Sequence, residues 1–240
     1  MPNKKSLIAI MVIILLLLID QSIKIWVKTH MYLGQEIQMF GYERALIHFV
    51  ENEGMAFGWK LELGQEYDYG KLLLSLFRIG AVLFLMMYIR SLVILKESTG
   101  LIVGFSMILA GALGNIIDSA IYGMIFTDSS FHTENIAILF PSEGAYGTFL
   151  HGKVVDMFYF PLFEGVFPAW IPKFGGEPFL FFRPVFNFAD ACISVGVASL
   201  ILFQRSFFKE EEKTPKSTDK VELSEENFIE EADLSQKSEA

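Results

Sequence analysis

Four apolar stretches, each long enough to cross a lipid bilayer, constrain this chain more than any other feature. A hydrocarbon core of about 30 Å needs about 20 helical residues to span it. The stretches run over residues 6–27, 71–95, 100–125 and 186–203. They predict an all-α membrane protein with four transmembrane helices. The first stretch follows two lysines, as a signal peptide would, but Asp20-Gln21 stands where a cleavage site with small residues is expected, so we expect an uncleaved helix.

Composition divides the chain into two parts. Residues 209–240 carry eleven acids and five lysines, which supply two thirds of the net charge of −9. We therefore expect a membrane domain over 1–208 and a disordered, acidic, cytoplasmic tail over 209–240. The absence of a basic excess disfavours a nucleic-acid binder. A single cysteine and four scattered histidines give no pattern for a disulfide framework, a metal site or a cofactor.

Basic residues in the short flanks predict the orientation. They precede the first span, lie between the second and third spans, and follow the fourth, which puts all of them on one side: Lys4, Lys5, Arg90, Lys96, Arg205 and Lys209. Such residues favour the cytoplasmic side. We expect both termini in the cytoplasm and the long loops 28–70 and 126–185 outside, with room for a small β element.

The segment 158–188 combines twelve aromatic residues with five prolines. The prolines rule out a fifth helical span, and irregular backbone is not tolerated against lipid tails. Aromatic side chains favour the headgroup layer. We expect this segment along the outer membrane surface, either as a passive anchor or as a lid over a lipid-handling site.

Polar residues inside three of the spans are expected at one depth. Charged groups within a membrane are costly and usually functional. The three pairs lie in the outer halves of their helices and are spaced to share a helix face: Asp20 and Lys24, Asn115 and Asp118, Asn187 and Asp190. This placement predicts one shared polar cleft that opens to the outer face. Arg78, in the second span, is expected to extend toward the membrane surface.

Five short motifs follow one another along residues 6–205. They are Asp20-Gln21-x-x-Lys24, Asn52-x-Gly54-x-Ala56-Phe57, Gly114-Asn115-x-x-Asp118, Gly152-x-Val154-x-Asp156 and Phe186-Asn187-x-Ala189-Asp190. Each motif alone is weak, but with all five in this order the chain resembles the lipoprotein signal peptidases (signal peptidase II), a family of membrane aspartyl proteases. The resemblance implies Asp156 and Asp190 as the catalytic pair. It implies a further set that supports the site or contacts substrate: Asp20, Lys24, Asn52, Gly54, Asn115, Asp118, Asn187 and Ala189.

The resemblance also implies a reaction and a location. The substrate would be a prolipoprotein with a diacylglyceryl-modified cysteine, cut just before that cysteine, in the cytoplasmic (inner) membrane of a bacterium, with the site facing outward. Two close carboxylates suit this hydrolysis because they can share one proton, so that one activates water while the other donates. We expect no metal at the site. We also expect the protein to be a monomer that contacts membrane lipid and its lipidated substrate.

Two departures from the family pattern stand out. The family usually has arginine directly after the third motif's aspartate, where this chain has Ser119. Lys153 or Arg183 are the candidates to replace that cation. Residues 126–150 resemble an insertion, which would either alter substrate access or only cover the surface.

Two other functions are compatible with intramembrane acids. One is a proton-coupled transporter with the aspartates as a relay, and the other is a scaffold in which the acids pair helices. The transporter is disfavoured because the polar groups lie on one side of the membrane and no inverted repeat is visible.

Overall fold

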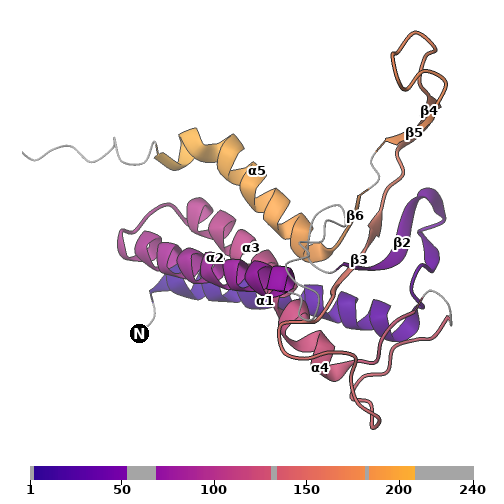
Figure 1. Ribbon diagram of the computed structural model, residues 1–240. Helices are drawn as coiled ribbons and strands as arrows, with labels where there is room; N and C mark the ends of the chain where they lie inside the picture. Colours follow the sequence, from indigo (N-terminus) through magenta and orange to yellow (C-terminus); the bar gives the residue numbers. More distant parts are fainter. Residues whose placement is uncertain (1–2, 53–68, 131–133, 182–183, 209–240) are drawn as a thin grey trace, which may run out of the picture.

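Long helices form one end of the molecule and β-sheet forms the other (Figure 1). The computed structural model describes residues 3–52, 69–130, 134–181 and 184–208. The helices are α1 (Lys4–His30), α2 (Tyr69–Ile94), α3 (Thr99–Ile117) and α5 (Phe188–Phe208). Beyond α3 the chain continues through a π-helical turn, η2 (Asp118–Tyr122), into the short α4 (Gly123–Ile125). These bounds lie close to the four predicted spans.

Three of these helical segments are long and apolar enough to cross a membrane: Lys4–His30, Leu73–Ile94 and Thr99–Ile125. The fourth predicted span corresponds to α5, whose apolar part Phe188–Phe203 is shorter. Many large apolar side chains on the helices are exposed, among them Leu18, Phe77 and Leu202. Such a surface suits lipid rather than water.

Polar caps and close helix contacts organise the bundle. The side chains of Asn3 and Ser98 accept backbone N–H bonds at the starts of α1 and α3. The Lys5 ammonium donates to the carbonyls of Lys96 and Glu97, at 2.8 and 2.5 Å, which ties the first turn of α1 to the α2–α3 turn. Two of the three predicted basic flanks therefore lie at the same end of the bundle. In the interior, α3 packs against α1, α2 and α5.

The segments between the helices form two sheets, which is more β structure than the small β element that we expected beside the helices. The first is antiparallel, in the order β1 (Glu36–Met39), β2 (Tyr42–Asn52), β3 (Val154–Tyr159) and β6 (Val185–Phe186). Apolar residues of this sheet join the C-terminal end of α1 and residues 122–126 in a hydrophobic core, which includes Val27, Phe49, Tyr122, Val155 and Met157. This core sets the sheet on the end of the bundle, and the expected β element is larger than a small one.

The aromatic segment also contains regular structure. Strands β4 (Phe163–Val166) and β5 (Pro178–Phe181) pair as a two-stranded antiparallel sheet. Pro168 and Pro172 fall in the connection between them, and Pro178 begins β5. Proline is tolerated at the start of an edge strand and in turns. The prolines therefore exclude a helix, as predicted, but they do not exclude a hairpin.

Candidate functional site

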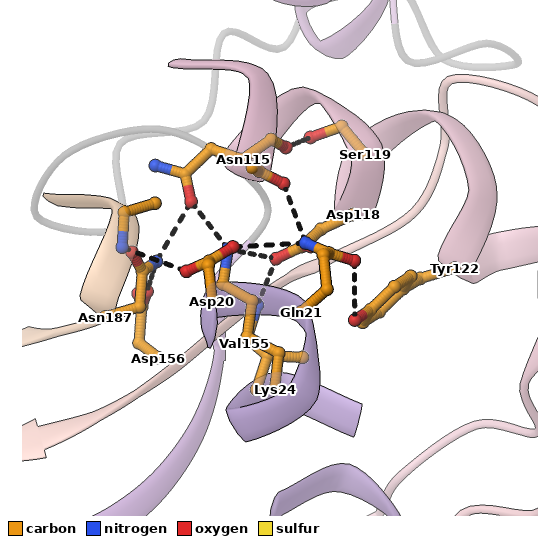
Figure 2. Close-up of polar contacts among 12 residues, drawn as sticks. Asp20, Gln21, Lys24, Asn115, Asp118, Ser119, Tyr122, Val155, Asp156 and Asn187 are labelled. Atoms are coloured by element: carbon orange, nitrogen blue, oxygen red, sulfur yellow. Dashed lines mark hydrogen bonds and ion pairs between the residues drawn. The ribbon is translucent and has the colours of Figure 1, made fainter. Parts of the chain in front are cut away.

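Polar side chains from four parts of the chain meet where the bundle joins the sheet (Figure 2). They come from α1, from the α3–η2 segment, from β3 and from the start of α5. The three polar pairs predicted at one depth are thus in one hydrogen-bonded cluster, together with Asp156 of β3. Asn52, at the end of β2, reaches this cluster too. Gly54, Ala56, Phe57 and Arg183 lie outside the residues that the structure describes.

Lys24 is the cation at the centre of the cluster. Its ammonium lies 3.0 Å from Asp20 Oδ2, 2.8 Å from Asp118 Oδ2 and 2.9 Å from Asn115 Oδ1. The side chains of Lys24, Asp20 and Asp118 are essentially inaccessible to solvent. A buried charge needs partners of opposite sign and satisfied hydrogen bonds. Three contacts use the donors of the ammonium group, so this lysine can remain charged away from water.

Asp20 connects α1 to the first turn of α5. Its Oδ1 accepts the backbone N–H of Ala189 at 2.9 Å, and its other oxygen contacts Lys24. Gly114 of α3 allows the approach, because a Cβ at this position would lie 2.5 Å from Asp20 Oδ2 and 3.2 Å from the Ala189 methyl group. These contacts explain why small residues stand at positions 114 and 189.

Asn187 and Asp190 form the start of α5. The backbone N–H of Asp190 donates to Asn187 Oδ1 at 2.9 Å, and the backbone N–H of Asn187 donates to Asp190 Oδ2 at 3.3 Å. This reciprocal arrangement is a capping box, which satisfies donors that a helix start leaves unpaired. The other carboxylate oxygen, Asp190 Oδ1, accepts from the Asn115 amide at 2.9 Å.

Asp156 lies next to Asp190, with Asn187 in contact with both. The Asn187 amide donates to Asp156 Oδ1 at 2.7 Å, and the Asn52 amide donates to Asp156 Oδ2 at 3.3 Å. The pKa of the Asp156 carboxyl is raised to about 7, first by burial and then by the charge of Asp190, while the hydrogen bonds from the two asparagines and the charge of Lys24 act in the opposite direction. The two acids, 34 positions apart in the chain, are therefore electrostatically coupled.

Asp118 supports the strand that carries Asp156. Its Oδ2 accepts the backbone N–H of Val155 at 3.2 Å, and its Oδ1 accepts from the Gln21 amide at 2.9 Å. Nearby, the backbone N–H of Gly152 donates to the Ser119 carbonyl at 2.8 Å, and a Cβ at Gly152 would lie 2.1 Å from the Asp118 carbonyl oxygen. The motif glycine therefore permits β3 to begin against η2.

The structure contradicts one candidate for the missing cation. Lys153 pairs with Asp128 at 2.8 Å and with Glu51 at 3.5 Å, so its charge is used away from Asp156 and Asp190. Ser119 is buried and donates to the Asn115 carbonyl at 3.1 Å. Arg78 of α2, which we expected to extend toward the membrane surface, is half-buried, and its charge acts on Asp190, Asp156 and Asp118.

Sequence reasoning missed a second buried cluster beside the site. Lys28, one helical turn after Lys24, pairs with Glu51 and donates to Ser129 Oγ at 3.1 Å. The rings of Tyr146, Phe126 and Phe49 lie 5.2, 5.3 and 6.0 Å from its ammonium. Burial of the Tyr146 phenol raises its pKa above the ordinary value. The i,i+4 spacing of Lys24 and Lys28, at the end of the first apolar span, was the available signal.

This second cluster attaches Phe126, Ser129 and Tyr146 to α1 and β2. Glu51 immediately precedes Asn52, so fixing Glu51 also fixes the amide that contacts Asp156. Among the residues that the structure describes, no three His, Cys, Asp or Glu side chains are grouped as metal ligands. The chemical groups assembled at the site are carboxylates, amides and one ammonium.

Known proteins match this chain over most of its length. The family model for signal peptidase (SPase) II matches residues 12–206. The lipoprotein signal peptidase of Porphyromonas gingivalis is 54% identical over 203 residues, which are 84% of each chain. That of Amoebophilus asiaticus is 36% identical over 198 residues, 80% of this chain and 75% of its own.

The fold has a solved counterpart as well. A bacterial membrane enzyme aligns with a TM-score of 0.50 and 19% identity, covering 87% of this chain and 93% of that one. The likeness concerns the fold alone, and the sequence matches carry the relationship: the chain belongs to the signal peptidase II family.

Proposed function

We propose that this protein is an aspartic endopeptidase that removes the signal peptide from prolipoproteins, with Asp156 and Asp190 as its catalytic residues. The observation that carries the proposal is the contact of Asn187 with both carboxyl groups. It holds two acids side by side, one of them with a pKa near neutrality. The curated relatives are named lipoprotein signal peptidases, which gives the substrate class.

The pair works with a single shared proton. The ionised carboxylate accepts a proton from a water molecule, whose oxygen attacks the carbonyl carbon of the scissile peptide bond. The protonated carboxyl group donates its proton to the carbonyl oxygen. When the tetrahedral intermediate collapses, the carbon–nitrogen bond breaks and the leaving amine takes a proton from the pair. The titration belongs to both acids together, so neither is assigned a single role.

The remaining polar residues hold this pair in place. Lys24, Asp20, Asn115 and Asp118 form the buried support beneath it, and Ala189 attaches α5 to that support. Asn52 orients Asp156 directly. We assign Gly54, which belongs to the same sequence motif, to contact with the substrate.

Charge balance gives Arg78 a role. Asp20, Asp118, Asp156 and Asp190 carry four acidic groups, and Lys24 and the shared proton neutralise only two of them. The charge of Arg78 acts on three of these acids and supplies the cation that Ser119 does not.

The proposal also covers how the substrate approaches, how the protein lies in the membrane and its oligomeric state. A precursor with a diacylglyceryl-modified cysteine approaches sideways from the bilayer and is cut before that cysteine. We propose α5 as the fourth span, the outer face of the bacterial inner membrane for the site, and a monomer as the working form. The transporter considered from the sequence gains no support from the family.

The test uses a purified lipidated precursor and mass analysis of its products. Asp156→Asn and Asp190→Asn should each abolish cleavage while the protein still inserts and folds. Asp128→Asn is the matched control, because Asp128 is an exposed acid that pairs with Lys153 outside the cluster. Normal turnover by either of the first two variants would exclude the proposed pair. A parallel reaction with unlipidated precursor determines whether the lipid is required.

A further inference from the structure

The hairpin of β4 and β5, with its connection, forms an arm (residues 162–181) that stands apart from the rest of the molecule. In Figure 1 it leaves the sheet at the end of the bundle opposite to the N-terminus and runs across the direction of the helices. Neither strand makes extensive contacts with any other helix or strand that the structure describes. At its base, the Arg44 guanidinium donates to the Leu162 carbonyl at 2.6 Å.

One face of the arm is built of phenylalanines. Phe163 is paired with Phe181, and Gly165 with Phe179, so these positions lie on one face and Phe167 continues it. The ring centroids of Phe163 and Phe181 are 5.9 Å apart, and those of Phe167 and Phe179 are 4.7 Å apart. The face is therefore a continuous aromatic row rather than scattered apolar residues.

This apolar surface remains largely uncovered. Phe163 and Phe181 are 60% and 55% exposed, and in the connection Trp170 and Phe174 are 80% and 50% exposed. A two-stranded hairpin on its own is only marginally stable in water and needs a surface to pack against. Contiguous exposed apolar surface of this kind marks a site of contact with a membrane or a partner.

We propose that the arm lies in the outer headgroup layer of the lipid bilayer, with its phenylalanine face and Trp170 turned into the membrane. The direction of the arm supports this occupant: a segment that runs across the helices, at their outer end, extends parallel to the membrane plane. Aromatic side chains favour that layer because they combine apolar rings with tolerance of polar surroundings. The exposed apolar surfaces of the helices require the same bilayer beside it.

The two faces of β4 provide the means to test this placement. Phe163 and Glu164 are neighbours in one strand, both exposed, with side chains on opposite faces. A membrane contact made by the phenylalanine face places position 163 deeper than position 164. A contact made by the tip alone would affect position 170 without separating the other two.

The experiment measures tryptophan fluorescence of the full chain in phospholipid vesicles. The chain has three tryptophans, at positions 26, 59 and 170. The Trp26→Phe, Trp59→Phe variant keeps only Trp170 and leaves the arm unchanged. Adding Trp170→Phe and then either Phe163→Trp or Glu164→Trp gives the matched pair. Each form is compared in vesicles of ordinary lipid, of lipid brominated near the headgroup, and of lipid brominated near the chain ends.

We expect blue-shifted emission from positions 170 and 163, with stronger quenching by bromine near the headgroup than near the chain ends. Position 164 should emit at longer wavelength and lose less intensity. Water-like emission and no bromine quenching at position 170 would overturn the proposal. A blue shift that disappears as the lipid-to-protein ratio is raised would also overturn it, because it would show that a second copy of the chain, and not lipid, covers the arm. None of these readouts depends on peptidase activity, so the proposal stands or fails apart from the catalytic pair.

Discussion

Replacing Asn52 by alanine should move the alkaline limb of the pH–rate profile to higher pH. The Asp156 carboxyl, with its pKa at about 7, is the group that holds the proton of the pair near neutrality. Above that pH both acids are ionised, no proton remains to donate to the substrate, and kcat/KM should fall. The Asn52 amide donates to Asp156 Oδ2 and so stabilises the ionised form. Removing this donor makes ionisation harder and raises the pKa.

The size of the shift follows from the length of the bond. A hydrogen bond to a charged group contributes about 1.5–3 kcal/mol, but at 3.3 Å this one lies at the long end, and about 1 kcal/mol is a reasonable value. One pKa unit corresponds to about 1.4 kcal/mol. The limb should therefore move up by roughly 0.7 pH units.

The assay records kcat/KM for a lipidated precursor from acidic to alkaline pH, in one detergent and at constant ionic strength. Asn135→Ala is the control, because the Asn135 amide bonds to the backbone of Ser130 and Asp128, away from Asp156. The alkaline limb of this variant should not move. If Asn52 only contacts substrate, Asn52→Ala lowers the whole profile without moving the limb. An unmoved limb, or one at lower pH, would refute the electrostatic reasoning.

Three further substitutions test the energetics of the site, each by thermal unfolding in detergent. At pH 8 the free energy of unfolding of Asp156→Asn should exceed that of the native chain by up to about 4 kcal/mol, because the raised pKa makes ionisation of the buried acid costly. That cost grows from about pH 4 to pH 7, so the two proteins should be equally stable at acidic pH. Lys24→Met should lower the free energy of unfolding by about 3–5 kcal/mol, because it leaves buried acids unpaired. An unchanged unfolding temperature would contradict the central role of this cation. Gly114→Ala should cost about 1–3 kcal/mol by placing a methyl group against Asp20, whereas Gly80→Ala meets no atom within 4 Å and serves as its control.

The helices and the shared depth of their polar groups were predictable because both are local properties of the sequence. An apolar run of sufficient length sets a span, and the direction of each span sets the depth of its polar residues. The side of the helix on which a polar residue finds its partners was not predictable in this way. We expected Arg78 to extend toward the membrane surface, whereas its charge acts on Asp190, Asp156 and Asp118, because depth does not determine which neighbour a helix face meets.

The sheet was not predictable in the same way. Its central pairing joins Val50 to Asp156, and such distant pairings leave little trace in either strand alone. Lys153, one of the two candidates to replace the missing cation, pairs instead with Asp128 and Glu51. Residues three positions apart in an extended chain point in opposite directions, so Lys153 and Asp156 need not share a face. The phenylalanines at 163, 179 and 181 were visible in the sequence, but the neighbouring prolines made regular structure in this segment hard to predict.

The contacts that hold the proposed catalytic pair are also those that hold the fold together. Asp20 accepts a backbone N–H bond from the first turn of α5, and Asp118 accepts one from the strand that carries Asp156. Lys24 forms ion pairs with both of these acids. A buried, ionisable Asp156 costs stability, and the ion-paired support beneath it offsets that cost. Changes in the support should therefore reduce stability and activity together, whereas neutralising Asp156 should remove activity and increase stability. That opposite response separates a group used for chemistry from a group used for structure.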